Sequence, residues 1–176
     1  MALITLRSMR STLVSACLLR IEGEVRKPLA LSFADLAALD AACQVPDVSR
    51  IDPKRKGDAV SLAGLLERVR PKTSAKYLTL HASADDFHAS IPLEAVRSRA
   101  ILIYRLDGQP LPVSAGGPVR FFIPDFAACH VAEVDECANV KFVDRIELTA
   151  GRGLDNRPHD DQEHAALHER ESTQKE

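Results

Sequence analysis

Aromatic residues are scarce in this sequence: none of the 176 residues is tryptophan, and aromatic side chains make up only 5% of the chain. Hydrophobic residues still account for 45%, so the chain can bury a core, and that core is expected to be aliphatic. No stacking aromatics alternate with basic residues, which argues against single-stranded nucleic-acid binding. The formal net charge of -2 also excludes a general attraction to nucleic acid or to an anionic membrane.

Long apolar segments are missing as well. The longest apolar run, residues 13–19, is far shorter than the ~20 residues that span a bilayer, so we expect no transmembrane segment. Arg7 and Arg10 before this run faintly resemble a secretory signal, but Arg20 follows at once and leaves no room for a cleavage site. We therefore expect a cytoplasmic protein, with export as the alternative.

Cysteine is sparse: the chain has four, which are Cys17, Cys43, Cys129 and Cys137. A small secreted scaffold held by disulfides carries more cysteines per residue. Reduced thiols are therefore the expected state.

What the sequence does contain is a mixed pattern of short strands and helices, which predicts a single compact α+β domain over residues 18–149. Alternating or apolar runs predict strands at 18–25, 77–82, 87–91, 101–106, 119–123 and 145–148. Helical spacing predicts helices near 31–36, 61–69 and 93–96, the first two capped by Ser32 and Ser61. Residues 1–17 are expected to form an N-terminal extension, and 150–176 a polar tail rich in His, Asp and Glu.

Residues 43–59 form the longest stretch of the predicted domain without a strand or helix pattern. A loop of this length in a compact domain indicates a functional role. It carries the basic run Lys54, Arg55 and Lys56. Such a run is either a solvated loop or a group of cations that contacts an anion.

Several segments, in one order, resemble the molybdopterin domain of the sulfite-oxidase family. Residues 107–112 (DGQPLP) and 116–124 (GGPVRFFIP) are similar to that family's "N-G-x-P-L-P…G-G-P-L-R-L-V-V-P" signature. Residues 139–148 (NVKFVDRIEL) resemble its "S-V-K-W-L-x-R-I-x-V" segment, and residues 60–66 its "G-V-P-L-x-x-L-L" helix. The resemblance covers about residues 18–149. It implies a mixed-sheet domain of the sulfite-oxidase type that binds molybdopterin, the molybdenum cofactor.

The cofactor-binding residues expected on this basis are Gly116, Gly117, Arg120 and Lys141. The two glycines permit a sharp turn and a close approach of backbone to a ligand. Arg120 and Lys141 stand in otherwise apolar stretches, where a cation needs a partner. A cofactor that ends in a phosphate supplies one, because arginine and lysine both bind phosphate. The alternative is that both cations face solvent on an edge strand.

The family's molybdenum is held by one cysteine, and Cys43 is the only cysteine in the corresponding interval. A thiolate is a soft ligand that suits this metal chemistry. However, the family's strand before the cysteine and the glycine after it are not recognisable here. Cys43 is therefore expected to be either the catalytic molybdenum ligand or a small buried residue at the end of the first helix.

A second group of metal-ligating side chains suggests a different site. It consists of Cys129, His130 and Cys137, together with His164 and His168, which are spaced to share one helix face in the tail. Two thiolates and two imidazoles would make a tetrahedral zinc site if the tail folds back. The spacing matches no standard zinc motif, and the alternative is a pair of buried cysteines with a solvated tail. His81 and His88, on the predicted hairpin, are expected to be surface or cleft residues.

Two functions follow, and the sequence leaves open whether the chain is an enzyme. In the first, the chain is a molybdopterin-dependent oxidoreductase domain that performs two-electron chemistry on a small substrate, alone or with a redox partner protein. In the second, it is a non-catalytic member of the fold that binds a metal through Cys and His, or binds another protein.

Overall fold

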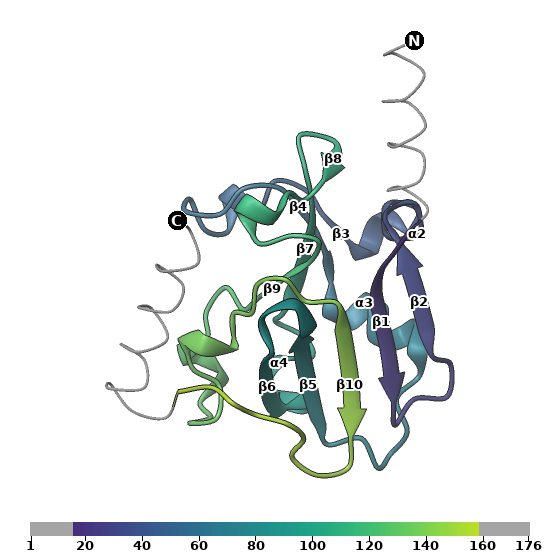
Figure 1. The fold of residues 1–176 in the computed structure, drawn as a ribbon, viewed down its shortest axis with the longest axis vertical. Helices are drawn as coiled ribbons and strands as arrows, with labels where there is room; N and C mark the ends of the chain where they lie inside the picture. Colours follow the sequence, from purple (N-terminus) through teal and green to yellow (C-terminus); the bar gives the residue numbers. More distant parts are fainter. Residues whose placement is uncertain (1–15, 159–176) are drawn as a thin grey trace.

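The computed structural model describes residues 16–158, which form an α+β fold of two sheets and a few short helices (Figure 1). The strands are β1 (Cys17–Gly23), β2 (Leu29–Ser32), β3 (Gln44–Val45), β4 (Asp58–Ser61), β5 (Tyr77–Ala82), β6 (Phe87–Pro92), β7 (Ile101–Leu106), β8 (Gln109–Pro110), β9 (Arg120–Phe122) and β10 (Arg145–Thr149). The helices are α2 (Phe33–Ala37), α3 (Leu62–Val69) and α4 (Leu93–Val96). Short 3-10 turns are η1 (Ala41–Cys43), η2 (Val48–Arg50), η3 (Ser83–Asp85), η4 (Val113–Ala115), η5 (Ala127–Cys129) and η6 (Glu136–Ala138).

The first sheet has the order β2-β1-β10-β5-β6, in which the central pair β1 and β10 is parallel and the other pairs are antiparallel. The first and the last strand of the predicted domain are therefore paired in the interior of one sheet. The second sheet has the order β3-β4-β7-β8, with β9 also paired to β7. The α+β class expected from the sequence is confirmed.

Local sequence accounts for the two longer helices. The Ser32 hydroxyl accepts a hydrogen bond from the backbone N–H of Asp35, and the Asp35 carboxylate accepts one from the backbone N–H of Ser32, which forms a capping box. The Ser61 hydroxyl likewise accepts from the N–H of Gly64. Leu62, Leu65 and their neighbours on α3 are buried against the core. Both predicted caps are confirmed.

The predicted loop at residues 43–59 was wrong in part. Strand β4 begins at Asp58, and the two residues after Cys43 form β3, which pairs with β4. A two-residue strand has no periodicity to detect, and its pairing is decided by a partner elsewhere in the sheet.

Two hydrophobic clusters lie on opposite faces of the second sheet. The main core contains Val60, Leu102 and Tyr104, and the second cluster contains Ala59 and Ile103. These residues alternate along β4 and β7, and side chains alternate between the faces of a strand. The second sheet is therefore buried on both faces, which explains why residues 101–104 read as one continuous apolar run.

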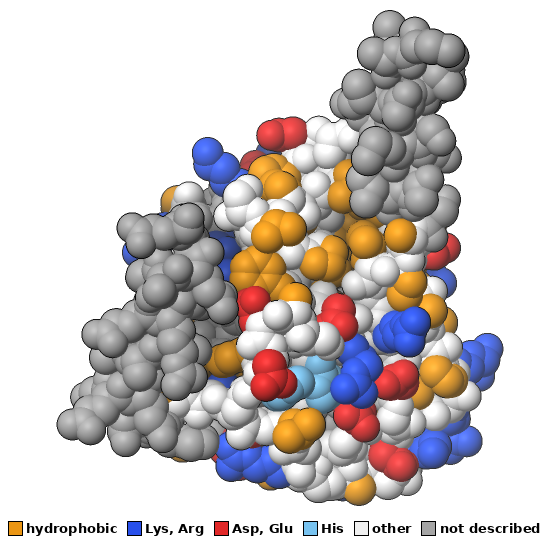
Figure 2. Space-filling view, viewed as in Figure 1, with side chains coloured by type: hydrophobic (Ala, Val, Ile, Leu, Met, Phe, Trp, Pro, Cys, Tyr) orange, Lys and Arg blue, Asp and Glu red, His pale blue; other side chains and the backbone are white. Residues whose placement is uncertain are grey.

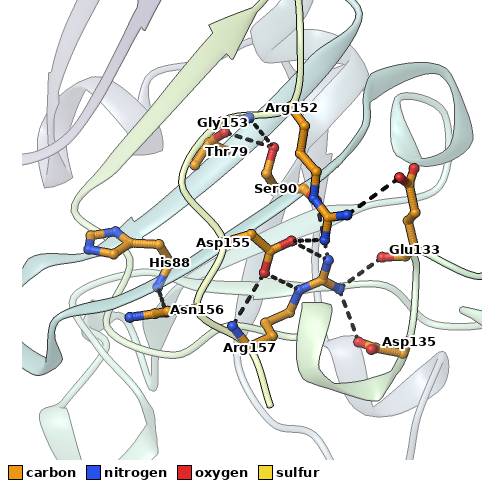
Figure 3. A network of polar contacts seen from close by, with 10 residues as sticks. All are labelled: Thr79, His88, Ser90, Glu133, Asp135, Arg152, Gly153, Asp155, Asn156 and Arg157. Carbon is orange, nitrogen blue, oxygen red and sulfur yellow. Dashed lines mark hydrogen bonds and ion pairs between the residues drawn. The ribbon is translucent and has the colours of Figure 1, made fainter. Parts of the chain in front are cut away.

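The start of the predicted tail contacts β6 through Gly153, Asn156 and Arg157 (Figure 3). The Gly153 N–H donates to the Ser90 hydroxyl at 2.9 Å, and Asn156 exchanges hydrogen bonds with the backbone of His88. Arg157 is buried, with only 4% of its surface exposed. We call residues 151–157 the strap. The rest of the predicted tail, including its polar helix, and residues 1–15 of the predicted extension lie outside the described residues.

His81 is buried rather than exposed, which corrects the expectation of a surface or cleft residue. Its Nδ1 lies 2.9 Å from Nδ1 of His88, and its Nε2 lies 3.2 Å from a carboxylate oxygen of Glu147. Figure 2 shows histidine among acidic and basic side chains on one face of the first sheet. Burial, with the charges of Arg145 and His88, lowers the pKa of His81, and Glu147 opposes this in part.

This lowered pKa predicts that the protein loses stability in mild acid. Below the ordinary histidine pKa of about 6.5 the unfolded chain takes up a proton at this position while the folded protein does not. The free energy of unfolding therefore decreases as the pH is lowered, at a slope of up to about 1.4 kcal/mol per pH unit for one proton. Urea midpoints at about pH 7.5 and about pH 5.5 measure it. His81→Gln is expected to flatten the dependence, whereas His130→Gln, at an exposed position, is the control.

Candidate cofactor-binding cleft

A cavity of about 230 Å³ lies on the second-cluster face of the second sheet. Its lining residues come from the loop before β4, from β7, from η4 and from β9: Lys54, Arg55, Lys56, Ile103, Leu106, Ala115 and Arg120. We call this cavity the cationic cleft. Four of its lining residues are cations, and none is acidic. The cleft is therefore an electrostatic attractor for an anion.

Arg55 and Arg120 each have an unused hydrogen-bond donor at the cleft. Among the described residues, their Nε atoms are buried and have no hydrogen-bond partner. Burial and the neighbouring charge of Arg55 lower the pKa of Arg120, and Asp52 compensates only in part. The two side chains have other contacts, since Arg120 Nη1 donates to the Ala115 carbonyl at 3.4 Å and Arg55 Nε lies 3.8 Å from the Asp52 carboxylate. Like charges with buried donors that make no hydrogen bond are still costly in a folded protein. A bound anion with several acceptor oxygens would remove both costs.

Gly116 places Arg120 beside Lys141. Its φ is +96°, in the left-handed region that favours glycine, and it ends the 3-10 turn η4. A Cβ built on Gly116 would lie 3.3 Å from Cδ of Arg120 and 3.2 Å from Cγ of Lys141. The glycine thus fits between the two side-chain stems. Three of the four residues expected to bind cofactor are thus neighbours in space. Arg120 lines the cleft, whereas Lys141 and the two glycines do not.

Position 117 has no room for a side chain, because the backbone of residues 111–112 packs directly against it. A Cβ on Gly117 would lie 1.9 Å from the carbonyl oxygen of Leu111, and the Gly117 N–H donates to the carbonyl of Pro112. The predicted close approach of backbone therefore exists, and its partner is residues 111–112 of the same chain. This approach holds η4 and Ala115 at the cleft.

Cys43 does not line the cationic cleft. It is the last residue of η1, it is buried, and it belongs to the main core. Its burial agrees with the expectation of a small buried residue, but it lies in η1, after the first helix α2 has ended at Ala37. Its assignment as the molybdenum ligand stays a prediction.

The predicted zinc site does not form among the described residues. No group of three or more His, Cys, Asp or Glu side chains in residues 16–158 is placed to hold a metal ion. Cys129 is buried in the main core, and His130 is exposed at the end of η5. Cys137 is half-buried, and burial and the acidic Asp135 raise its thiol pKa, which opposes the thiolate form that zinc needs. His164 and His168 lie outside the described residues.

The basic run lines the cleft, a position that its local sequence pattern does not predict. Lys54, Arg55 and Lys56 follow Pro53 in a region without periodicity, and a solvated loop was the other interpretation of them. The structure places all three at the wall of the cleft, with the Arg55 guanidinium 5.4 Å from the centre of the Phe122 ring. The detectable signal was the length of the loop together with its charge.

The sequence-family model described as "Oxidoreductase molybdopterin binding domain" matches residues 58–153, which is more than half of the chain. The chain belongs to this family. Arg120, Lys141 and the two glycines lie inside the matched residues, whereas Lys54, Arg55 and Lys56 lie before them. A comparison with curated proteins gives no match.

Solved structures include a similar fold. The sulfane dehydrogenase SoxCD from Paracoccus pantotrophus is 22% identical, with a TM-score of 0.56, over 77% of this chain and 39% of that chain. At this identity the likeness shows the fold alone. This molybdopterin-binding domain thus spans about two fifths of the length of that chain. Within residues 16–158, no helix has the length and apolar character needed to cross a bilayer.

The residues of the cleft fit part of the family's cofactor. The unpartnered Nε atoms and the surplus of positive charge suit an anionic phosphate. The cavity is smaller than the ~300–1,000 Å³ of typical ligand pockets, so it matches one end of a cofactor rather than the whole. A soft donor for molybdenum is not part of its lining.

Proposed function

We propose that this domain binds molybdopterin by its anionic end in the cationic cleft. The observation that carries the proposal is the pair of buried Nε atoms of Arg55 and Arg120, which make no hydrogen bond and belong to two like charges that Asp52 compensates only in part. Lys54 and Lys56 add two further cations to the wall. Lys141, whose stem packs on Gly116 beside Arg120, extends the positive surface outward.

The proposed activity is that of an oxidoreductase domain acting on a small substrate together with a redox partner protein. When bound, the cofactor supplies two-electron redox chemistry. The part of this chain is to bind and orient it. Arginine forks fix the direction of a phosphate, and Gly116 and Gly117 hold η4 and Ala115 in place against it.

Arg120→Met is expected to lower the cofactor content of the purified protein. Losing charge-assisted hydrogen bonds worth about 1.5–3 kcal/mol weakens binding by roughly tenfold to a hundredfold. Protein produced in cells that make the cofactor is analysed for molybdenum and for pterin per chain. Arg97→Met is the matched control, because Arg97 makes a surface ion pair with Glu94 and does not line the cleft. Equal pterin in Arg120→Met and the unchanged protein contradicts the proposal.

The position of Cys43 favours a second function, cofactor binding without catalysis. Its thiol lies in the main core, so the described cysteines provide no ligand at the cleft. Reduction of an artificial electron acceptor by the loaded protein, tested over a panel of small oxidisable substrates, separates the two functions. Turnover supports the oxidoreductase, and pterin binding without turnover supports the carrier.

A further inference from the structure

All four cysteines of the sequence lie in the described part of the chain, and none of them lines the cationic cleft. Cys17 is exposed on β1 at the far sheet, Cys129 is buried in the main core, and Cys137 is half-buried in η6. Cys43 is the one nearest in sequence to the cleft loop. Its accessibility therefore decides whether a thiol of this chain can reach the cofactor.

Cys43 belongs to the main core, on the face of the second sheet away from the cleft. It lies in the 3-10 turn η1 just before β3, so its packing decides its face and the sheet register does not. Gln44 pairs with Val60, and Val45 pairs with Ala59. Val60 points into the main core and Ala59 into the second cluster.

The cleft residues lie on the other face. Arg120 pairs with Ile103, a member of the second cluster, and alternates along β9 with Phe121 of the main core. Arg55 lies over Phe122, which also belongs to the second cluster. The second sheet therefore separates the Cys43 thiol from the cationic cleft, and a rotamer change cannot carry it across.

Close packing also fixes the Cys43 thiol. A Cβ built on Gly64, in the first turn of α3, would lie 2.4 Å from the sulfur atom of Cys43. The sulfur thus occupies the space that a side chain at position 64 would need. The Cys43 N–H donates to the carbonyl of Asp40, which ties η1 in place. The thiol fills a gap in the core between η1 and α3.

We infer that this domain holds its cofactor by charge and hydrogen bonds in the cationic cleft, with no bond from a thiolate of its own chain to the metal. The inference rests on the proposed function. It makes the retention of cofactor independent of Cys43 and sensitive to ionic strength. A site that binds its ligand through the charges of its cations weakens as salt screens them, whereas a metal–thiolate bond does not.

The first test compares Cys43→Ala with Arg120→Met in protein loaded during expression. Circular dichroism and a thermal melt establish that each variant is folded before analysis. Cys43→Ala is expected to keep molybdenum and pterin within about twofold of the unchanged protein, and Arg120→Met to lose most of both. Molybdenum X-ray absorption is expected to give the same number of sulfur neighbours with and without Cys43.

The outcomes are distinct. Loss of molybdenum, or of one sulfur neighbour, from folded Cys43→Ala that keeps its pterin overturns the inference and leaves the proposed function standing. Unchanged pterin in Arg120→Met overturns the proposed function. An unchanged protein that carries no pterin at all overturns both.

The second test uses the apoprotein and needs no cofactor. In a variant with Cys17→Ser, Cys129→Ala and Cys137→Ser, only the Cys43 thiol remains, and its reaction with a water-soluble disulfide reagent is followed before and after denaturation. We expect the native thiol to react at least about a hundredfold more slowly, as for a buried thiol. A native rate equal to the denatured rate shows a thiol open to ligands and overturns the inference.

Salt sensitivity supplies the third readout. Loaded protein is passed through a desalting column at about 0.05 M and at about 1 M sodium chloride. Most of the pterin is expected to leave at the higher salt. If the protein retains all of its pterin at both salt concentrations, an interaction other than charge attraction holds the cofactor, and this result counts against the inference.

Discussion

Arg157→Met is expected to destabilise the fold by about 3–5 kcal/mol, the typical cost of removing one partner from a buried ion pair. Arg157 is 4% exposed, and its guanidinium donates to Asp155, Asp135 and the carbonyls of Glu133 and Ser90 (Figure 3). Methionine fills similar space but leaves the buried Asp155 carboxylate without its main donor. Urea unfolding followed by circular dichroism measures the change.

The pKa of Asp155 explains the size of this effect. Burial by itself raises the pKa, but hydrogen bonds from Arg157 and then Arg152 lower it well below the ordinary range. The ionised carboxylate thus depends on these donors. Stability from this group is present above the unfolded aspartate pKa of about 3.9 and is lost as the pH falls below it.

Arg152→Met is the matched control for Arg157→Met. Arg152 also pairs with Asp155, at 2.8 Å, but its own side chain is 44% exposed. Exposed ion pairs contribute at most about 1 kcal/mol, so the control is expected to cost no more than that. Equal effects of the two substitutions would contradict the role of burial. If Arg157→Met costs less than about 1 kcal/mol, the strap is held by other contacts.

Gly117→Ala is expected to cost about 3 kcal/mol, at the upper end of overpacking effects, and to lower cofactor content. The new methyl group would lie 1.9 Å from the Leu111 carbonyl oxygen and 2.6 Å from its carbon. Both atoms are backbone, so the clash is relieved only by moving residues 111–117. That movement shifts Ala115 at the cleft and Gly116 between Arg120 and Lys141.

Chemical unfolding and pterin analysis of the same preparation measure both parts of this prediction. Gly151→Ala is the control, since a Cβ at position 151 meets nothing within 4 Å, and its cost is expected within about 0.5 kcal/mol. If Gly117→Ala leaves the stability unchanged, the backbone of residues 111–112 can move at little cost to accommodate the new methyl group. Unchanged stability together with lost pterin would instead place the ligand against Gly117.

Local patterns predicted most of the regular structure because the information lies within a few residues. Ser32 and Ser61 cap helices through hydrogen bonds to residues three positions ahead, and the strands at 77–82 and 87–91 pair across a tight turn. The strand β4 was missed. Its two middle residues, Ala59 and Val60, are buried on opposite faces by distant partners, and its first residue pairs with Arg105 on β7.

The candidate site was predicted unevenly for the same reason. Gly116, Arg120 and Lys141 belong to two recognisable segments, and the structure brings them together. Lys54, Arg55 and Lys56 carried no pattern that fixed their direction, and their place at the cleft follows from how the loop before β4 crosses the second sheet. The burial of Arg157 was also beyond local reasoning, because its partners lie up to 67 residues away.

The sequence by itself determined that this chain has an aliphatic α+β core and the segments of a molybdopterin-binding domain. Those properties depend on composition, on side-chain spacing and on short ordered motifs, which are all read along the chain. Only the tertiary structure decided that Arg55 and Arg120 share a cleft while the Cys43 thiol lies across the sheet from them. The face on which a side chain lies is set by strand register and by packing between distant residues, and neither is written in the local sequence.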